Sequence, residues 1–163
     1  MTTPSKADAG QDLLTPATVR LGISAADRRD AIQQAGQLLI NVGAVDPAYV
    51  EAMHEREEVM SSFMGEGFAL PHGTDESRKH VHRAAVAFVQ FDAPVVWDDE
   101  DEETLAALAV AAASDEHVGV LATLAKVLVD EDKAERLRTT DDVDEVLELL
   151  APAIEEEIEE DAT

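Results

Sequence analysis

Hydrophobic residues recur along this chain at two spacings, and the spacing predicts which segments are helices and which are strands. Helical spacing begins after Ser24, a suitable N-cap, and stops before Gly43, a suitable helix end; the apolar positions are Ile32, Ala35, Leu39 and Val42. Asp46-Pro47 indicates a second helix start, because proline is favoured in the first turn of a helix. We expect this second helix to run to about residue 55 or 57.

Short apolar runs that lack helical spacing predict strands, at residues 19–21, 68–70 and 84–91. Asp92-Ala93-Pro94 is expected to break the last of these, and the acidic run 98–103 is expected to form a solvated loop. Residues 105–113 fit either a buried strand or a helix. We favour a strand, because Ser114 restarts the pattern.

Two more helices are expected in the C-terminal third, one from Ser114 through Leu128 and one capped near Thr140 and closed by Pro152. Strands that alternate with helices predict an α/β layer fold with a small sheet. Residues 1–18 are expected to be a flexible N-terminal arm, residues 19–151 one domain, and residues 152–163 an acidic C-terminal tail.

The charge balance is strongly acidic. Twelve Lys and Arg face 36 Asp and Glu, for a formal net charge of −24 and a sequence pI near 4.2. Long-range repulsion therefore disfavours nucleic acid and anionic membranes as partners. A surface rich in carboxylates and poor in lysine also leads us to expect a halophilic protein from a high-salt cytoplasm, where salt screens the self-repulsion.

Cysteine and long apolar segments are both absent from the sequence. The lack of cysteine excludes disulfides, thiolate metal sites and cysteine nucleophiles. The longest apolar run, residues 105–113, is too short to span a bilayer, so we expect a soluble, cytoplasmic protein. His80 and His82 leave a transition-metal site open as an alternative, although no third ligand follows at a suggestive spacing.

The candidate reactive residue, His72, lies in the segment from Gly65 to Thr74, which has the sequence GEGFALPHGT. Pro71 biases the preceding residue towards extended geometry, so His72 is expected to leave a strand. Gly73 lacks a Cβ and would let backbone amides approach a ligand of His72. A strand-to-loop turn with an exposed histidine is the simpler interpretation of the same residues.

Three other features suit an anion beside His72. If Ser114 caps its helix, His117 lies in the first turn, where free N–H groups and the positive helix end favour an anion. Arg56 could hold phosphate oxygens by two hydrogen bonds, or form a surface ion pair with neighbouring glutamates. Residues 78–83 form a basic patch that could offset repulsion of a phosphate. Together these residues describe a reversible phosphohistidine site.

The chain resembles the enzyme IIA component of the phosphoenolpyruvate-dependent sugar phosphotransferase system, of the fructose/mannitol type. The resemblance rests on Glu55-Arg56-Glu57, on the Gly65-Glu66 and Leu70 to Thr74 stretches, on Glu116-His117, and on residues 143–150, which fall in this order. It implies a mixed sheet of about five strands flanked by helices, and no metal or organic cofactor.

The resemblance also implies roles for individual residues. His72 would accept phosphate from phospho-HPr through Nε2 and pass it to a cysteine of enzyme IIB. His117 would hydrogen-bond the phosphoryl group, Arg56 would support it, and Gly73 would lie at the phosphate. Because this chain has no cysteine and no membrane span, IIB and the permease IIC are expected to be separate proteins.

These residues do not identify the sugar, because in the family the IIA component transfers phosphate to another protein and never contacts the sugar. We expect a fructose system, with a mannitol system as the alternative. A nitrogen-type regulatory module, whose phosphorylation switches a protein partner, is the alternative from a different functional class. The sequence assigns no role to His54, His80 and His82.

Overall fold

The computed structural model describes residues 13–97, 102–112 and 116–150, with only the backbone given for residues 116–120. Its centre is a sheet of five strands in the order β1-β4-β5-β3-β2. The strands are β1 (Val19–Ile23), β2 (Phe63–Gly65), β3 (Phe68–Ala69), β4 (Ala85–Val96) and β5 (Glu103–Ala111). Two neighbouring pairs are parallel, β1 with β4 and β3 with β5, and the other two are antiparallel. The predicted α/β fold with a five-stranded mixed sheet is confirmed.

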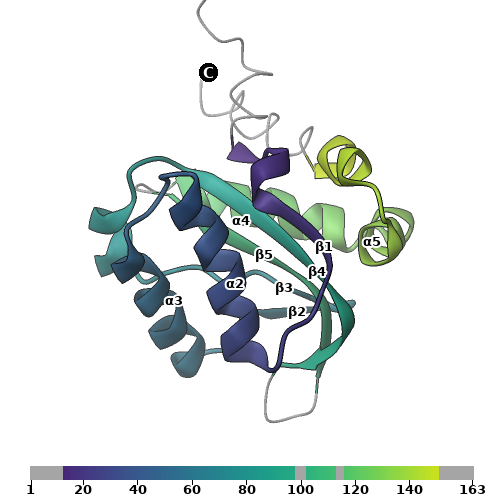
Figure 1. The fold of residues 1–163 in the computed structure, drawn as a ribbon, viewed down its shortest axis with the longest axis horizontal. Coiled ribbons are helices and arrows are strands. Elements are labelled where there is room, and N and C mark those ends of the chain that lie inside the picture. Colours follow the sequence, from purple (N-terminus) through teal and green to yellow (C-terminus); the bar gives the residue numbers. More distant parts are fainter. Residues whose placement is uncertain (1–12, 98–101, 113–115, 151–163) are drawn as a thin grey trace, which may run out of the picture.

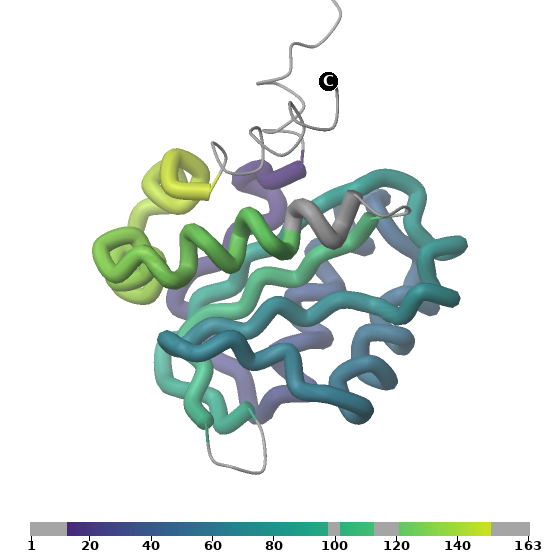
Figure 2. The backbone as a smooth tube through the Cα atoms, turned by 180° about the vertical axis from the view of Figure 1, so that it is seen from behind, coloured from purple at the N-terminus to yellow at the C-terminus, as the bar shows by residue number. Residues whose placement is uncertain are grey.

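Helices cover both faces of the sheet. Helices α2 (Arg28–Asn41) and α3 (Pro47–Val59) lie side by side on the face shown in Figure 1. Helices α4 (Glu116–Leu128) and α5 (Glu131–Thr139) lie on the other face, where Figure 2 shows α4 in front of the strands. Residues 143–150 are also helical, and two short 3-10 turns, η1 (Pro16–Thr18) and η2 (Glu76–His80), complete the described elements.

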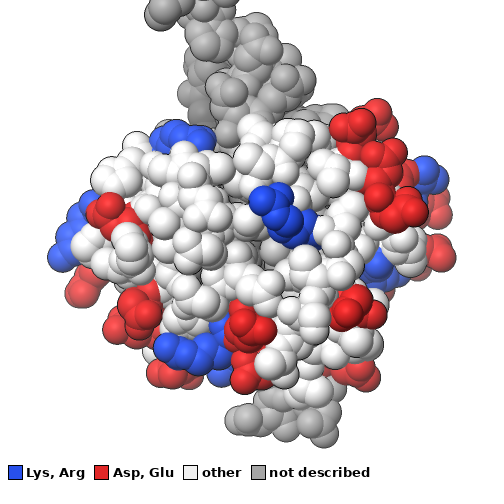
Figure 3. Space-filling view, viewed as in Figure 1, with Lys and Arg blue, Asp and Glu red and all other residues white. Residues whose placement is uncertain are grey.

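The alternation of side chains along the strands divides the core in two. One cluster joins α2 and α3 to the sheet through residues such as Ile32, Met53 and Trp97. The other joins α4, α5 and residues 143–150 to the opposite face through residues such as Phe68, Leu108 and Leu150. Small side chains fill much of the sheet between them, with Ala85, Ala87, Ala106, Ala107 and Ala109 all buried. On the face of α2 and α3, most charged groups lie towards the rim (Figure 3).

Several element boundaries differ from the sequence-based expectation. Helix α2 is capped by Asp27, whose side chain accepts a hydrogen bond from the Asp30 amide at 2.8 Å, and not by Ser24. Strand β4 continues through Pro94, because a register shift between Gln90 and Val95 accommodates a residue that cannot donate to the ladder. Strand β2 and helix α5 were not expected.

A further difference concerns residues 13–18, which fall in the range expected to be a flexible arm. Leu14 is 1% exposed and packs in the second core cluster, and residues 16–18 form η1, so packing begins inside the range assigned to the arm. Residues 1–12, the acidic residues 98–101, the expected cap Ser114 and the tail with Pro152 lie outside the described residues. No helix within the described residues is long and apolar enough to cross a membrane.

The glycines of the Gly65-Glu66-Gly67 segment make the turn between β2 and β3. All three residues have positive φ, with Glu66 at 55° between glycines at 97° and 83°. Left-handed backbone of this kind favours glycine, which explains the composition of the turn without a ligand. The turn reverses the chain so that β3 leads into His72.

Candidate functional site

His72 lies three residues after β3, where it forms an isolated parallel bridge with Val110 of β5. Its imidazole is partly buried, and Nδ1 lies 2.9 Å from the backbone carbonyl oxygen of Leu70. Because a carbonyl oxygen can only accept, Nδ1 must carry the proton. In the neutral ring the lone pair is therefore on Nε2, which makes Nε2 the nucleophilic nitrogen.

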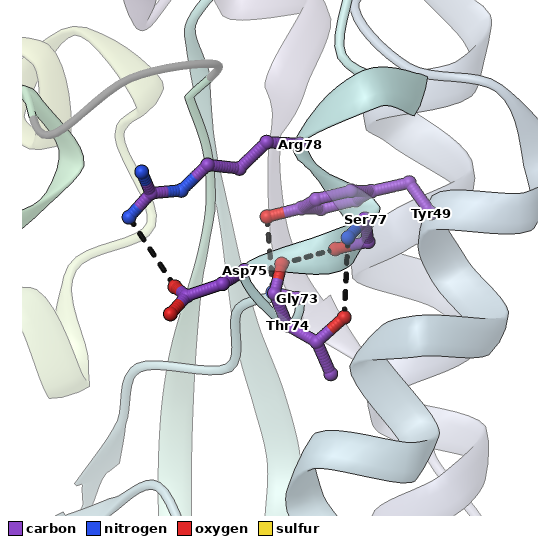
Figure 4. A network of polar contacts seen from close by, with 6 residues as sticks. All are labelled: Tyr49, Gly73, Thr74, Asp75, Ser77 and Arg78. Atoms are coloured by element: carbon purple, nitrogen blue, oxygen red, sulfur yellow. Dashed lines mark hydrogen bonds and ion pairs between the residues drawn. The ribbon is translucent and has the colours of Figure 1, made fainter.

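The backbone beside His72 is held by Tyr49, in the first turn of α3. The Gly73 amide donates to the Tyr49 hydroxyl at 2.9 Å, and the hydroxyl donates to the Val110 carbonyl at 2.8 Å. Figure 4 shows the Tyr49 side chain reaching Gly73 from the helix. The Gly73 amide, expected to approach a ligand of His72, is thus engaged with a buried hydroxyl in this structure.

A compact turn follows His72. The Ser77 hydroxyl donates to the Thr74 carbonyl at 2.6 Å, and the Ser77 amide donates to the Thr74 hydroxyl at 3.2 Å. Arg78 pairs with Asp75 at 3.3 Å (Figure 4). These contacts start η2, which follows the candidate nucleophile in the chain.

A second set of contacts holds the strand before His72. The Leu70 amide donates to the Ser62 carbonyl at 3.0 Å, and the Ser62 amide donates to the Glu57 carboxylate at 2.9 Å. The same carboxylate oxygen accepts from the Trp97 indole N–H at 2.6 Å, and Glu57 is only 3% exposed. The carbonyl that orients His72 therefore belongs to a residue anchored, through Ser62, to a buried carboxylate.

Arg56 lies in the last turn of α3, partly buried, one residue before Glu57. Its Nη1 donates to the carbonyl oxygen of Met60 at 2.8 Å. This contact satisfies one of the carbonyls that a helix end leaves without an intrahelical partner. The structure thus gives Arg56 a capping contact, and its role at a phosphoryl group stays a prediction.

His117 is the second residue of α4, and its side chain lies outside the described residues. The backbone still limits where it is. Strand β5 ends at Ala111, one residue beyond the partner of His72, and α4 begins at Glu116. The chain therefore passes from the strand beside His72 to the first turn of α4 within a few residues.

The remaining histidines have partners away from His72. His82 Nε2 lies 2.7 Å from one Asp46 carboxylate oxygen, and His80 Nδ1 lies 3.8 Å from the other. The hydrogen bond from His82 is the main reason that the pKa of Asp46 is lowered. No group of three or more metal-ligating side chains is found among the described residues. His54 is buried and contacts Gln33 Oε1 at 3.0 Å.

Sequence reasoning missed Tyr49, Glu57 and Ser62 as parts of this site. Tyr49 bonds Gly73 and Val110 across 24 and 61 residues of chain, and Glu57 bonds Trp97 across 40, which local patterns do not register. Ser62 belongs to the site through Glu57, five residues before it. One signal was available for Tyr49, since it is the single tyrosine of a chain with few aromatics. Its hydroxyl had to find a partner once the ring was buried.

Comparison with known proteins identifies the family. The family model described as "Phosphoenolpyruvate-dependent sugar phosphotransferase system, EIIA 2" matches residues 12–152. The mannitol-specific phosphotransferase enzyme IIA component of Halalkalibacterium halodurans is 34% identical over 140 residues, which cover 86% of this chain and 95% of that protein. The PTS system mannitol-specific EIICBA component of Pasteurella multocida is 39% identical over 149 residues, which cover 90% of this chain.

A solved structure agrees with these relatives. The complex of enzyme IIAMTL and phosphorylated enzyme IIBMTL from Escherichia coli matches with a TM-score of 0.80 and 39% identity, over 85% of this chain and 97% of that one. The chain spans less than a quarter of the length of the first relatives it matches, for example 24% of the Pasteurella protein. The family model and the Halalkalibacterium relative, together with the shared fold, show that this chain belongs to the EIIA type 2 family of the phosphoenolpyruvate-dependent sugar phosphotransferase system.

Proposed function

We propose that this chain is the IIA phosphocarrier of a mannitol-type system, in which His72 accepts a phosphoryl group from phospho-HPr and passes it to a cysteine of enzyme IIB. The observation that carries the proposal is the 2.9 Å contact between His72 Nδ1 and the Leu70 carbonyl. It places the ring proton on Nδ1 and the lone pair on Nε2. A partly buried imidazole held in this tautomer is prepared for attack on phosphorus.

The reaction is two successive displacements at one phosphorus atom. In the first, the Nε2 lone pair forms a bond to phosphorus while the bond between phosphorus and the donor breaks. The Leu70 carbonyl stabilises the positive charge that develops on the ring through the Nδ1 proton. In the second, a cysteine thiolate attacks the phosphorus, the Nε2–phosphorus bond breaks, and its electron pair returns to the ring. No proton is lost from Nδ1 in either step.

Arg56, His117 and Gly73 take supporting roles in this proposal. The Arg56 guanidinium would leave the Met60 carbonyl and bind equatorial phosphoryl oxygens. His117, in the first turn of a helix that starts close to the partner strand of His72, would donate a hydrogen bond to the same group. Gly73 contributes by the space it leaves beside His72 more than by its amide, which Tyr49 occupies.

Mannitol is preferred to fructose because of the relatives. The fructose system expected from the sequence finds no support among them, whereas relatives of 34% to 42% identity carry mannitol in their names. IIB is the proposed acceptor because the E. coli structure pairs a similar IIA with phosphorylated IIB. HPr as donor and IIC as the membrane component follow from the family.

The decisive experiment is incubation with phosphoenolpyruvate, enzyme I and HPr, followed by intact mass measurement at neutral pH. The wild-type chain is expected to gain one phosphoryl group, and His72→Ala none. His82→Ala is the matched control, since it removes an exposed imidazole that contacts Asp46, and it is expected to be phosphorylated normally. Labelling that survives His72→Ala would overturn the assignment of His72.

The IIB protein that accepts phosphate from this chain would identify the sugar and the physiological role. Phosphorylated chain is mixed with IIB of the mannitol type and, separately, with IIB of the fructose type, and transfer to each cysteine is followed. Faster transfer to the mannitol type is expected. Faster transfer to the fructose type would reverse the choice of sugar, and transfer to neither would favour the nitrogen-type regulatory alternative. His117→Ala is expected to leave phosphorylation detectable and to slow this onward step.

A further inference from the structure

The pairing of His72 with β5 departs from a regular parallel ladder. In a regular parallel ladder, Val110 would donate its amide to the carbonyl of the residue before His72. Its carbonyl would accept from the amide of the residue after His72. The Val110 amide follows this pattern and donates to the Pro71 carbonyl at 3.0 Å. At the second position, the Tyr49 hydroxyl accepts from Gly73 and donates to Val110, so a side-chain hydroxyl joins the two backbone groups.

The hydroxyl is well placed to define this position. Tyr49 is 4% exposed and belongs to the core cluster between α3 and the sheet, so its ring is fixed by packing. Burial raises the pKa of its phenol, so the hydroxyl keeps its proton at neutral pH and can donate to Val110. One rigid group on a helix thereby sets the distance between the His72 segment and β5.

Gly73 is required by the same arrangement. A Cβ at Gly73 would lie 2.5 Å from Ser77 Oγ, and 2.6 Å and 2.8 Å from two carbon atoms of the Tyr49 ring. Contacts below 3.0 Å are not found for real Cβ atoms, and a ring packed in the core cannot move aside freely. Glycine therefore admits the Tyr49 ring beside His72.

We propose that Tyr49 is a positioning residue for phosphoryl transfer, whose hydroxyl, between the Gly73 amide and the Val110 carbonyl, fixes the backbone from which the His72 imidazole is presented. The proposal rests on the proposed function of His72. Without the hydroxyl, the Gly73 amide can bond directly to Val110, which would draw the segment towards β5 and displace the ring from its contact with Leu70. Tyr49 acts through His72 and does not touch the phosphoryl group.

The test compares Tyr49→Phe with a control in the same turn. Tyr49→Phe keeps the ring and removes only the hydroxyl, and Ser77→Ala removes another buried hydroxyl that bonds Thr74 and not Gly73. Phosphorylation by phospho-HPr is measured over a range of donor concentrations, together with the melting temperature of each variant. We expect kcat to fall about tenfold in Tyr49→Phe, with KM within about twofold, because a displacement on the order of 1 Å is costly in an oriented site. Ser77→Ala is expected to keep the wild-type kcat.

An NMR measurement on the unphosphorylated protein gives a readout that needs no activity. In the wild-type chain the ¹⁵N shifts of the neutral His72 ring should report a proton on Nδ1. In Tyr49→Phe, the Nδ1-protonated fraction should fall and the Gly73 amide resonance should move. Ser77→Ala should leave the ring shifts unchanged.

The outcomes separate this proposal from the function on which it rests. A wild-type kcat in Tyr49→Phe, or a loss of kcat in both variants that follows their melting temperatures, would overturn the positioning role. If the wild-type chain is not phosphorylated at all, the proposed function fails and the NMR arm alone decides. Ring shifts that are identical in Tyr49→Phe and wild type would then overturn the role of Tyr49, and altered ring shifts would uphold it.

Discussion

Two histidine segments of this chain, residues 70–74 and residues 78–83, differ in which ring nitrogen makes the described contact. In residues 70–74, Nδ1 of His72 donates to the backbone carbonyl of Leu70, two residues earlier. In residues 78–83, Nε2 of His82 bonds the carboxylate of Asp46. The Leu70 carbonyl fixes the proton of His72 on Nδ1 and leaves the lone pair on Nε2, whereas in His82 it is Nε2 itself that bonds a carboxylate. Residue type alone does not distinguish the two histidines; the acceptor does.

The two segments also differ in what holds their backbones. Residues 70–74 lie between β5 and α3, anchored to Val110 and Tyr49. Residues 78–83 are tied to the loop after α2, where Val81 bridges Val45, and the His82 amide donates to the Ala44 carbonyl. Arg83 also donates to the Val42 carbonyl in this loop. The basic patch thus has a structural role, and the His72 segment is the one presented from the sheet.

The largest effect should come from replacing Gly73 with alanine. The added methyl group would overlap the Tyr49 ring and Ser77 Oγ, so we expect a loss of roughly 1–3 kcal/mol in the free energy of unfolding, together with strongly reduced phosphorylation. Urea denaturation and the phosphorylation assay measure both. Wild-type stability in Gly73→Ala would show that the turn is looser than the contacts around Gly73 indicate.

The next effect tests whether an arginine near each segment has the same role. Arg56→Ala should slow phosphoryl transfer about 10- to 100-fold if its guanidinium stabilises charge on the phosphoryl oxygens. Arg83→Ala removes an arginine that donates to the Val42 carbonyl, and it should transfer phosphate at the wild-type rate. Equal rates in the two variants would remove Arg56 from the site and leave it only as the cap on Met60.

A smaller effect is expected at His54, which is buried, unlike His72 and His82. It concerns the dependence of stability on pH. Burial is the main cause that lowers its pKa below 6.5; the charged groups that also act on it are Arg28, Arg29, Glu51 and Glu58. Since the unfolded chain then binds the proton more readily, His54 contributes stability that is complete above pH 6.5 and is lost as pH falls through its folded pKa. Denaturation at pH 7.5 and pH 5 should show a steeper loss for wild type than for His54→Gln. Parallel losses would contradict this account of His54.

The smallest effect is expected at His82. Replacing it with alanine removes the main cause of the lowered pKa of Asp46, so that pKa should rise towards 3.8 in a carboxylate titration by NMR. The pair is exposed, so the melting temperature near neutral pH should hardly change. A large loss of stability or of phosphoryl transfer in His82→Ala would mean that the two histidine segments are coupled.

The sequence predicts those parts of the fold that repeat a local pattern. The sequence pattern predicts the apolar face of α2, the proline at the start of α3 and the long buried strands. The α/β class follows from these elements. Strand β2 has three residues and shows no period, and α5 buries only two side chains, Ala134 and Leu137, so neither leaves a clear signal. Pro94 indicated a break, but a register shift in β4 absorbs it.

The residues of the candidate site also separate into those that a local pattern predicts and those that depend on distant contacts. The sequence identifies His72 as a candidate because Pro71 and Gly73 flank it. It identifies Arg56 and His117 because they lie in stretches that resemble the family. Tyr49 and Glu57 act through contacts with residues far along the chain, and such contacts depend on how α3 packs against the sheet. Reading the site from sequence therefore finds the group that reacts and misses the groups that orient it.

The central claim is that His72 reacts through Nε2 because its other nitrogen is held by Leu70. It is tested most directly by phosphorylating ¹⁵N-histidine-labelled protein with phosphoenolpyruvate, enzyme I and HPr and recording ¹⁵N and ³¹P spectra at neutral pH. We predict a single phosphohistidine, at His72, with phosphorus bonded to Nε2 and the proton retained on Nδ1. Phosphorus on Nδ1 of His72, or on any other histidine, would contradict the account.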